Sequence, residues 1–509
     1  MKDVLFILLC TIFLLACEQT KEEAPSPNII YILADDLGYG ELGSYGQELI
    51  ATPHLDALAA NGMRFTQHYS GSPVCAPSRC VLLTGQHTGN AYIRGNDEWA
   101  ARGEVWNFAK AVEDPNLEGQ RPLPDSIPTI AHLLKQKGYA TGMVGKWGLG
   151  APLTDGIPNN RGFDFFYGYN CQRQAHTLYP KHLWKNKEKV WLDNDLIAPH
   201  QALDSLADPN DAMAYAKFFQ KDFAPALMHE AALGFLEENK ETPFFLYYAS
   251  PLPHLPLQVP QEYIDQYKGK FDEEAYVGNK GYFPAQYPRS TYAAMITYLD
   301  QQVGELVQKL KDLGQYENTL IIFSSDNGPT YTGGADTEFF DSAKPFKTTR
   351  GWGKGFTHEG GIRVPMIASW PGKIAAASES EHISAFWDVL PTLVEITNAE
   401  LPPHYDGISF LPTLLGKEQS EEHEYLYWEF PAYQGQQAVR MGKWKAIRKN
   451  IFKGNMDIEL FDLALDPREQ KDLAKQEPEI LAKMEQIMID AHTEAEIPRF
   501  KIKELGDQK

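Results

Sequence analysis

The feature that most constrains the fold is a pair of short apolar runs, almost 300 residues apart, that both end in polar residues. The first run ends at Asp35 and Asp36, and the second ends at Asp326 and Asn327. Their β-branched and aromatic content predicts buried strands. In a parallel sheet both strands deliver their ends to the same edge, where ligand sites of α/β proteins gather.

The segments around these runs alternate between strand and helix patterns. Strands are predicted at residues 29–34, 140–144, 244–249, 319–324 and 364–368. Helices are predicted at residues 52–59, 126–137 and 292–313, the first of them capped by Thr52 with Pro53 at its first position. This alternation predicts an α/β fold with a mixed, mostly parallel sheet flanked by helices.

The pattern changes near residue 415. Short strands are predicted at residues 424–430, 437–440, 444–448 and 459–462, and a helix at residues 480–491. These elements indicate a small antiparallel sheet with one helix packed on it. We therefore predict a large domain at residues 28–415 and a small C-terminal α+β subdomain at residues 416–509.

The N-terminus has the pattern of an export signal. Lys2 precedes an almost wholly apolar run that ends in Leu14-Leu15-Ala16-Cys17, which resembles the lipobox of bacterial lipoproteins. Residues 1–17 are then a signal peptide ending at lipidated Cys17, and residues 18–27 are a tether. The alternative is a plain signal peptide with a chance cysteine. Glu18 after the cysteine favours the outer membrane of a Gram-negative host, on its periplasmic face or at the cell surface.

The charge balance excludes one class of partner. The chain carries 68 Asp and Glu against 47 Lys and Arg, a formal net charge of −21. Nucleic acids select basic surfaces, so we expect no nucleic-acid partner. An acidic surface remains compatible with a locally cationic pocket.

Three cysteines follow the predicted signal peptide: Cys75, Cys80 and Cys171. An odd number in an exported protein means that at least one stays outside an intramolecular disulfide. If Cys75 has another role, Cys80 and Cys171 are left as a potential pair.

A motif around Cys75 gives that cysteine another role. The segment Cys75-Ala76-Pro77-Ser78-Arg79, followed by Leu83-Thr84-Gly85, matches in full the C-x-P-S-R-x-x-x-L-T-G signature of the type I sulfatases. The chain resembles this family, and within it arylsulfatases and the carbohydrate-active sulfatases of bacteria. The resemblance implies that a maturation enzyme converts Cys75 to formylglycine.

Other segments resemble the family in the same order along the chain. They are Asn28-Ile29-Ile30 with Asp35-Asp36-Leu37-Gly38, Gly145-Lys146-Trp147-Gly148-Leu149-Gly150, Ser325-Asp326-Asn327-Gly328, and Gly353-Lys354-Gly355 with Glu359-Gly360-Gly361-Ile362-Arg363-Val364-Pro365. The resemblance implies an alkaline-phosphatase-like fold in which residues 28–415 form the catalytic domain.

The resemblance also implies a metal site. Asp35, Asp36, Asp326 and Asn327 would hold Ca²⁺ together with the modified residue 75. Carboxylate and amide oxygens are hard ligands that suit Ca²⁺, or as a second choice Mg²⁺, and the chain has no His/Cys cluster of zinc spacing.

The implied catalytic residues are basic. Arg79 would orient the nucleophile and the sulfate, and Lys146 and Lys354 would neutralise sulfate oxygens. His254, which lies between two prolines, would protonate the leaving alkoxide.

One position departs from the family pattern. The family has histidine after Gly-Lys-Trp, and this chain has Gly148. The family histidine is thought to help release sulfate from the covalent intermediate. We take His176 as the candidate stand-in, and we hypothesise that Gly148 opens room for a bulkier substrate.

The substrate is expected to be a sulfated carbohydrate with a galactose or N-acetylgalactosamine type unit. Arg94, Asn96, Arg173 and His176 lie in polar loops with aromatic neighbours such as Trp106, and we predict them as substrate contacts. A purely structural loop is an equal alternative for Arg173 and His176.

Two other functions compete with sulfate-ester hydrolysis. One is a phosphate or phosphonate ester hydrolase of the same fold. The other is a non-catalytic lipoprotein that captures sulfated glycans. The absence of the family histidine at Gly148 is the reason to consider it.

Overall fold

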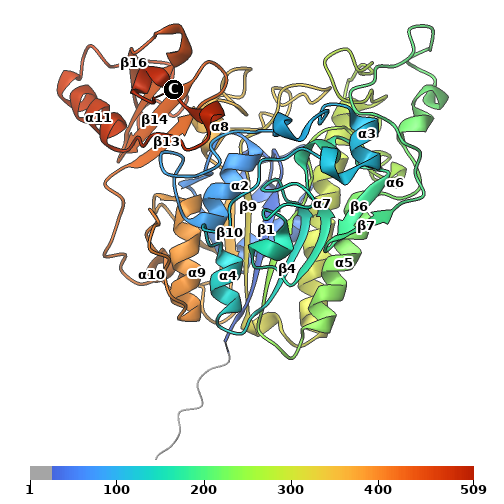
Figure 1. Ribbon diagram of the computed structural model, residues 1–509, viewed down its shortest axis with the longest axis horizontal. Coiled ribbons are helices and arrows are strands. Elements are labelled where there is room, and N and C mark those ends of the chain that lie inside the picture. Colours follow the sequence, from blue (N-terminus) through green and yellow to red (C-terminus); the bar gives the residue numbers. More distant parts are fainter. Residues whose placement is uncertain (1–25, 509) are drawn as a thin grey trace, which may run out of the picture.

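The computed structural model describes residues 26–508, and its centre is a ten-stranded sheet (Figure 1). In sheet order the strands are β11 (Ser378–Ser380), β2 (Met63–Phe65), β10 (Met366–Ser369), β9 (Thr319–Ser325), β1 (Asn28–Ala34), β8 (Phe244–Ala249), β4 (Ala140–Lys146), β5 (Phe165–Tyr169), β6 (His182–Lys185) and β7 (Glu188–Trp191). The strands from β9 to β5 are mutually parallel, whereas β10 and β6 are antiparallel to their neighbours. The predicted mixed, mostly parallel sheet is confirmed.

Helices cover both faces of the sheet, because the central strands are apolar on both sides. In β1, Ile29, Tyr31 and Leu33 face one core, while Ile30 and Ile32 face the other. The first core includes residues of α2 (Cys75–Thr84), α4 (Ile130–Lys135) and α9 (Val389–Thr397), and the second includes residues of α1 (Pro53–Ala60), α5 (Ala224–Glu238) and α7 (Pro288–Asp312). Figure 1 shows α4 and α9 on one side of the sheet and α5 and α7 on the other.

Shorter elements lie in the connections. They are the helices α3 (Phe108–Glu113), α6 (Gln261–Ile264), α8 (Glu359–Ile362) and α10 (Leu411–Leu414), and the paired strands β3 (His68–Tyr69) and β12 (Ser384–Ala385).

The C-terminal part forms the predicted small sheet. Its four antiparallel strands are β13 (Leu426–Phe430), β14 (Gln436–Met441), β15 (Trp444–Lys449) and β16 (Ile458–Asp462), with α11 (Pro478–Asp490) packed against them. Gln436 in β14 donates a hydrogen bond to the Gly355 carbonyl at 2.8 Å, and Trp428 in β13 donates to the Ser70 carbonyl at 2.9 Å. The small sheet therefore supports the loop that carries Lys354 and the segment that precedes α2.

Several elements differ from the sequence predictions. The helix expected at residues 126–137 is reduced to α4, and the strand expected at residues 364–368 is β10, which is antiparallel to β9. The helix α2 and the strands β5–β7 were not predicted. Cys17 and the signal peptide lie outside the described residues, and no helix within residues 26–508 is long and apolar enough to cross a membrane.

Thr52 is the N-cap residue of α1 and Pro53 is its first residue, as predicted, but the Thr52 side chain makes no cap bond. The Thr52 hydroxyl accepts from the Gly43 amide at 2.8 Å and makes no cap bond to α1. Instead Asp300 on α7 accepts from the backbone amides of His54 and Leu55 at 3.2 and 2.7 Å. A carboxylate from a different helix thus satisfies the first amides of α1, where negative charge is favourable.

Replacing this carboxylate should destabilise the fold. Asp300→Ala leaves the amides of His54 and Leu55 without their acceptor, so we expect the free energy of unfolding to fall by about 1–2 kcal/mol. Thermal and chemical denaturation measure the change, with Gln301→Ala on the exposed side of α7 as the control. Equal stability of the two variants would contradict the capping role.

Candidate active site

Four acidic and amide side chains meet where β1 and β9 end. These strands pair in parallel, with Ala34 opposite Ser325, so Asp35 and Asp326 follow at the same level. The backbone amide of Asp326 donates to the Ala34 carbonyl at 3.0 Å, and the amide of Asp36 donates to Oδ1 of Asp326 at 3.1 Å. The structure therefore brings together the residues that the sequence predicted as one group.

The backbone and an amide side chain fix the orientation of Asp36. Its φ of +67° lies in the left-handed region that non-glycine residues rarely occupy. Such conformations persist where the surroundings hold them, often at functional sites. Asn327 donates from Nδ2 to Oδ1 of Asp36 at 2.8 Å. The Asn327 Oδ1 is buried and has no hydrogen-bond partner among the described residues.

Cys75 is the first residue of α2 and is 3% exposed. Its thiol donates to Oδ1 of Asp35 at 3.5 Å. Arg79 lies one turn later on the same helix face, because residues four apart are neighbours on a helix. Its guanidinium donates to Oδ2 of Asp326 from Nε and Nη2 at 3.1 and 2.8 Å, and to the Lys146 carbonyl.

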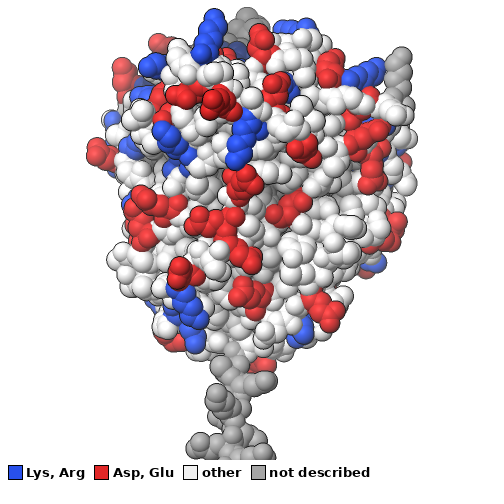
Figure 2. All heavy atoms as spheres, turned by 90° about the vertical axis from the view of Figure 1, so that its left-hand side faces the viewer, with Lys and Arg blue, Asp and Glu red and all other residues white. Residues whose placement is uncertain are grey.

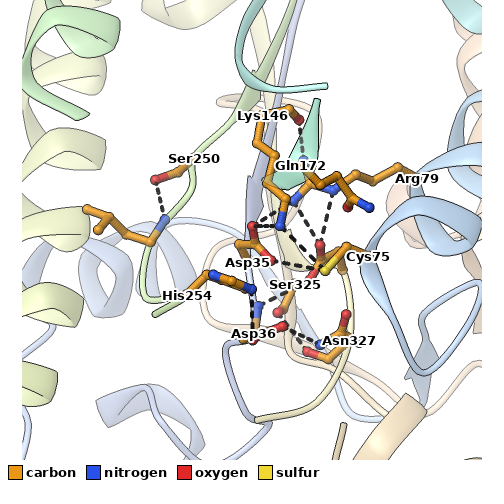
Figure 3. A network of polar contacts seen from close by, with 12 residues as sticks. Asp35, Asp36, Cys75, Arg79, Lys146, Gln172, Ser250, His254, Ser325 and Asn327 are labelled. Atoms are coloured by element: carbon orange, nitrogen blue, oxygen red, sulfur yellow. Dashed lines mark hydrogen bonds and ion pairs between the residues drawn. The ribbon is translucent and has the colours of Figure 1, made fainter. Parts of the chain in front are cut away.

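Two lysines complete the group around Cys75, and Figure 3 labels one of them, Lys146. Lys146 ends β4, and its Nζ lies 2.6 Å from Oδ2 of Asp35 and 3.5 Å from the Cys75 sulfur. Lys354 comes from the loop before α8, and its Nζ lies 2.6 and 2.7 Å from the two carboxylate oxygens of Asp36 and 3.5 Å from the same sulfur. Both lysines therefore point at the side chain of position 75.

Gly145 allows Lys146 to reach this position. Its φ is +115°, and a Cβ there would lie 1.9 Å from the Ala249 carbonyl oxygen of the neighbouring strand. Only glycine fits such a close approach of two strands.

His254 lies beside the carboxylates on the loop after β8. Its Nδ1 donates to the Leu255 carbonyl at 2.6 Å, which leaves Nε2 facing Oδ2 of Asp36 at 3.8 Å. His176 stacks on the His254 ring with a centroid distance of 5.5 Å. The Nδ1 of His176 is 3.1 Å from Nε2 of His200, and the ring of Tyr282 lies against both His176 and His200. Neither His200 nor Tyr282 was predicted, because their approach depends on the folding of distant loops.

Burial and charge set the protonation of this group. Burial and the neighbouring Asp35 raise the pKa of Asp326, and burial raises that of Asp36. Burial works against ionisation of Asp35 too, but Lys146, His254 and Arg79 hold its pKa below the usual value. Burial raises the pKa of the Cys75 thiol to about 12. The unmodified thiol therefore stays protonated near neutral pH and is a weak nucleophile.

The donor set fits a divalent cation. Three buried carboxylates repel one another, and Asn327 offers a free amide oxygen beside them. Asp35, Asp36, Cys75 and His254 each place a potential ligand atom within 4.8 Å of the others. A hard cation among these oxygens would relieve the repulsion between the carboxylates and supply a partner for Asn327.

The predicted substrate contacts fall into two groups. Asn96 is exposed and His176 and Arg173 are half-buried, with Arg173 packed over the exposed ring of Trp106 at 5.0 Å. The prediction for Arg94 does not hold. This side chain is 2% exposed, pairs with Glu429 at 2.6 Å and donates to Thr493. Arg94 therefore joins the small sheet to the large domain.

The structure answers one question that the sequence left open and corrects one hypothesis. Cys80 and Cys171 are both buried free thiols in the described chain, so they form no pair with each other. The space beside Gly148 is not open, because a Cβ at this position would lie 2.9 Å from Cγ of Gln172. Gln172 rather than His176 occupies this space, and Gln172 was not among the predicted site residues.

Fold and site together define a hydrolase of the alkaline-phosphatase-like class. The family model described as Sulfatase matches residues 27–399, and the model described as N-sulphoglucosamine sulphohydrolase, C-terminal, matches residues 349–494. The chain belongs to the sulfatase family, and it is a sulfuric ester hydrolase.

Known proteins are similar over almost the whole chain. Human arylsulfatase A is 32% identical, over 92% of this chain and 88% of that protein. The N-acetylgalactosamine-6-O-sulfatase of Bacteroides thetaiotaomicron is 29% identical, over 93% of this chain and 94% of that protein. The crystal structure of Ps i-CgsB superposes with a TM-score of 0.71 at 28% identity and covers 92% of this chain and 94% of that one.

The paired contacts of Arg79 give a direct test of the site. Arg79→Lys keeps the positive charge but cannot make the forked contact with Asp326 while also reaching the Lys146 carbonyl. We expect kcat/KM for an aryl sulfate to fall at least about 100-fold. Arg161→Lys, at a buried arginine that donates to the Pro124 carbonyl, is the control for the loss of a buried guanidinium. Similar activity of the two variants would argue against the role of Arg79.

Proposed function

We propose that this protein hydrolyses sulfate esters of carbohydrates, with formylglycine at position 75 and Ca²⁺ as cofactor. The reaction is R–O–SO₃⁻ + H₂O → R–OH + HSO₄⁻. The observation that carries the proposal is the position of the Cys75 side chain, with Lys146, Lys354 and Asp35 each 3.5 Å from its sulfur. A sulfate bound to this residue would lie between two ammonium groups.

Each implied group has residues that fit it. Asp35, Asp36, Asp326 and Asn327 would hold the cation, which would supply positive charge to the nucleophile and to the sulfate oxygens. Hydrated formylglycine would supply one hydroxyl for attack on sulfur and a second whose proton loss expels sulfate. The thiol found at this position in the sequence supplies neither.

The basic side chains stabilise charge where the transition state develops it. Sulfuryl transfer spreads negative charge over the sulfate oxygens, and preorganised cations lower its energy. Arg79 is held by Asp326, so it is fixed before the substrate arrives. Lys146 and Lys354 are the movable cations, because each can exchange its carboxylate partner for a sulfate oxygen.

His254 is positioned to handle the proton of the leaving group. The hydrogen on Nδ1 is committed to the Leu255 carbonyl, so Nε2 is the atom that holds or donates a proton. Burial and the charges of Lys146 and Lys354 lower the pKa of His254. A bound sulfate ester neutralises these lysines, so the protonated imidazole that donates to the alkoxide is favoured in the complex.

The proposal for a carbohydrate substrate is supported by the side chains around the site and by the relatives. Asn96, Arg173 and His176 offer polar contacts, and Trp106 is 62% exposed beside Arg173. An exposed aromatic ring with neighbouring hydrogen-bonding groups suits a sugar. One relative is an N-acetylgalactosamine-6-O-sulfatase, and Ps i-CgsB has been crystallised with k-i-k-neocarrahexaose. We propose a galactose or N-acetylgalactosamine type unit.

We also propose that the chain is an exported lipoprotein anchored through Cys17 in the outer membrane. The support is the Leu14-Leu15-Ala16-Cys17 sequence and the polar residues that follow it.

On the face shown in Figure 2, acidic side chains are spread out with basic ones among them, so the net charge of −21 is not gathered there in one patch.

Mass spectrometry of the peptide that contains position 75 tests the proposed nucleophile. In protein co-expressed with a maturation enzyme, we expect a loss of about 18 Da relative to cysteine. The same preparation should hydrolyse an aryl sulfate much faster than the matching aryl phosphate. An unmodified thiol in active enzyme would rule out formylglycine, and faster phosphate cleavage would favour the phosphate or phosphonate ester hydrolase.

Calcium should stabilise the folded protein through the four predicted ligands. A concentration 100 times the Kd adds about 2.7 kcal/mol to the free energy of unfolding. Asp36→Asn removes one ligand charge and suits the left-handed backbone, so we expect it to abolish most of the calcium-induced rise in thermal midpoint. Asp300→Asn, outside the site, should keep the rise. An equal rise in both variants would show that calcium binds elsewhere.

A further inference from the structure

Gly148 and Gln172 share one space beside the site. The pairing of β4 with β5 brings them together, because Trp147 and Gly148 donate backbone hydrogen bonds to the carbonyls of Tyr169 and Asn170 at 2.9 and 3.1 Å. Gly148 has a φ of +87°, and a Cβ there would lie 2.9 Å from Cγ and 3.1 Å from Cδ of Gln172. The glutamine therefore supplies the side chain at a place where position 148 has none.

A backbone amide fixes which way the Gln172 side chain is turned. The amide of Ala76, the residue after Cys75, donates to Oδ1 of Asn96 at 3.1 Å. Because a backbone amide can only donate, this atom of Asn96 is the oxygen. Gln172 approaches the same oxygen at 3.1 Å, so it does so with Nε2. The Oε1 of Gln172 is therefore directed elsewhere.

This oxygen lacks a donor. Gln172 is 5% exposed, and its Oε1 has no hydrogen-bond partner within residues 26–508. Figure 3 shows the side chain among Lys146, Arg79 and Cys75. Sulfate oxygens are acceptors and cannot donate a hydrogen bond to Oε1 of Gln172. The Cys75 thiol is a weak donor and already faces Asp35.

We propose that Gln172 is a positioning residue for the nucleophile, and that its Oε1 accepts a hydrogen bond from one hydroxyl of hydrated formylglycine at position 75. This inference rests on the proposed function. The hydrate carries two hydroxyl donors on one carbon, and the site has two acceptors for them. Asp35 accepts one, in the place of the thiol, and Gln172 accepts the other.

The chemistry of the amide limits what Gln172 does. An amide oxygen is a good acceptor but a very weak base, so it holds the hydroxyl without removing its proton. Only the hydrate can make this hydrogen bond, because the aldehyde has no hydroxyl group to donate. Gln172 therefore favours the hydrated form and fixes the direction of its hydroxyls.

The test compares Gln172→Met with Gln302→Met in enzyme co-expressed with a maturation enzyme. Methionine nearly keeps the length of the side chain and removes the acceptor. Gln302 on α7 is a matched control, since it is 2% exposed, donates to the Pro225 carbonyl at 2.9 Å and has an Oε1 that finds no partner in the described chain. An aminooxy reagent labels the aldehyde but not the hydrate, so its rate of reaction with the folded enzyme reports the aldehyde fraction.

We expect Gln172→Met to be labelled several-fold faster than the wild type. Its kcat for 4-nitrophenyl sulfate should fall about tenfold while KM changes less than about twofold. Gln302→Met should match the wild type in both measurements. Labelling of the unfolded proteins should be equal and shows that their formylglycine content is the same. Gln172→Asn shortens the side chain and should also raise the rate of labelling. It replaces the methionine variant in the test if that variant does not fold.

Two results would overturn the inference. Unchanged labelling with unchanged kcat removes the role of Gln172. A raised KM with unchanged labelling places Gln172 against the substrate instead of the nucleophile. A wild type that is never labelled, folded or unfolded, lacks the aldehyde, and then the proposed function itself fails.

Discussion

The structure depends on the mutual neutralisation of three carboxylates and three cations, all buried except Lys354, which is partly exposed. Asp35, Asp36 and Asp326 stand at two strand ends, and Arg79, Lys146 and Lys354 reach them from three other elements. An unpaired charge at such a depth costs several kcal/mol, so removing one partner leaves an uncompensated charge that destabilises the site. This balance joins the ends of β1, β4 and β9 to α2, and it gives the site its charge before a substrate arrives.

The same balance connects structure to chemistry. Arg79 forms a forked contact and stays in place, whereas the ammonium group of each lysine is paired with one carboxylate, which it can exchange. A cation among the carboxylates would replace the lysines as their counter-charge. The lysines would then be free to bind a sulfate, at the side chain of position 75 to which both already point.

Much of this site followed from local sequence. The strands at β1 and β9 were predictable because their apolar runs are rich in β-forming residues and end at acidic residues, and parallel pairing puts such ends together. Segments that resemble the sulfatase family predicted four further site residues: Cys75, Arg79, Lys146 and Lys354. The helix α2 was missed because Pro77, Ser78 and Arg79 interrupt its apolar run. The Thr52 side chain makes no cap bond because a carboxylate on α7 accepts from the first amides of the helix. Arg94 was misplaced because its partner Glu429 is 335 residues away, and Gln172 was missed because the space it fills belongs to a different loop. Apart from α2, each error concerns a contact between distant segments, which local pattern does not encode.

The most direct test of the account is a crystal structure of a Cys75→Ser variant with calcium and an aryl sulfate. We predict one cation bound by Asp35, Asp36, Asp326 and Asn327, and a sulfate beside position 75 with Lys146 and Lys354 moved from their carboxylates to its oxygens. A sulfate bound elsewhere, or lysines still paired with Asp35 and Asp36 beside a bound sulfate, would contradict it.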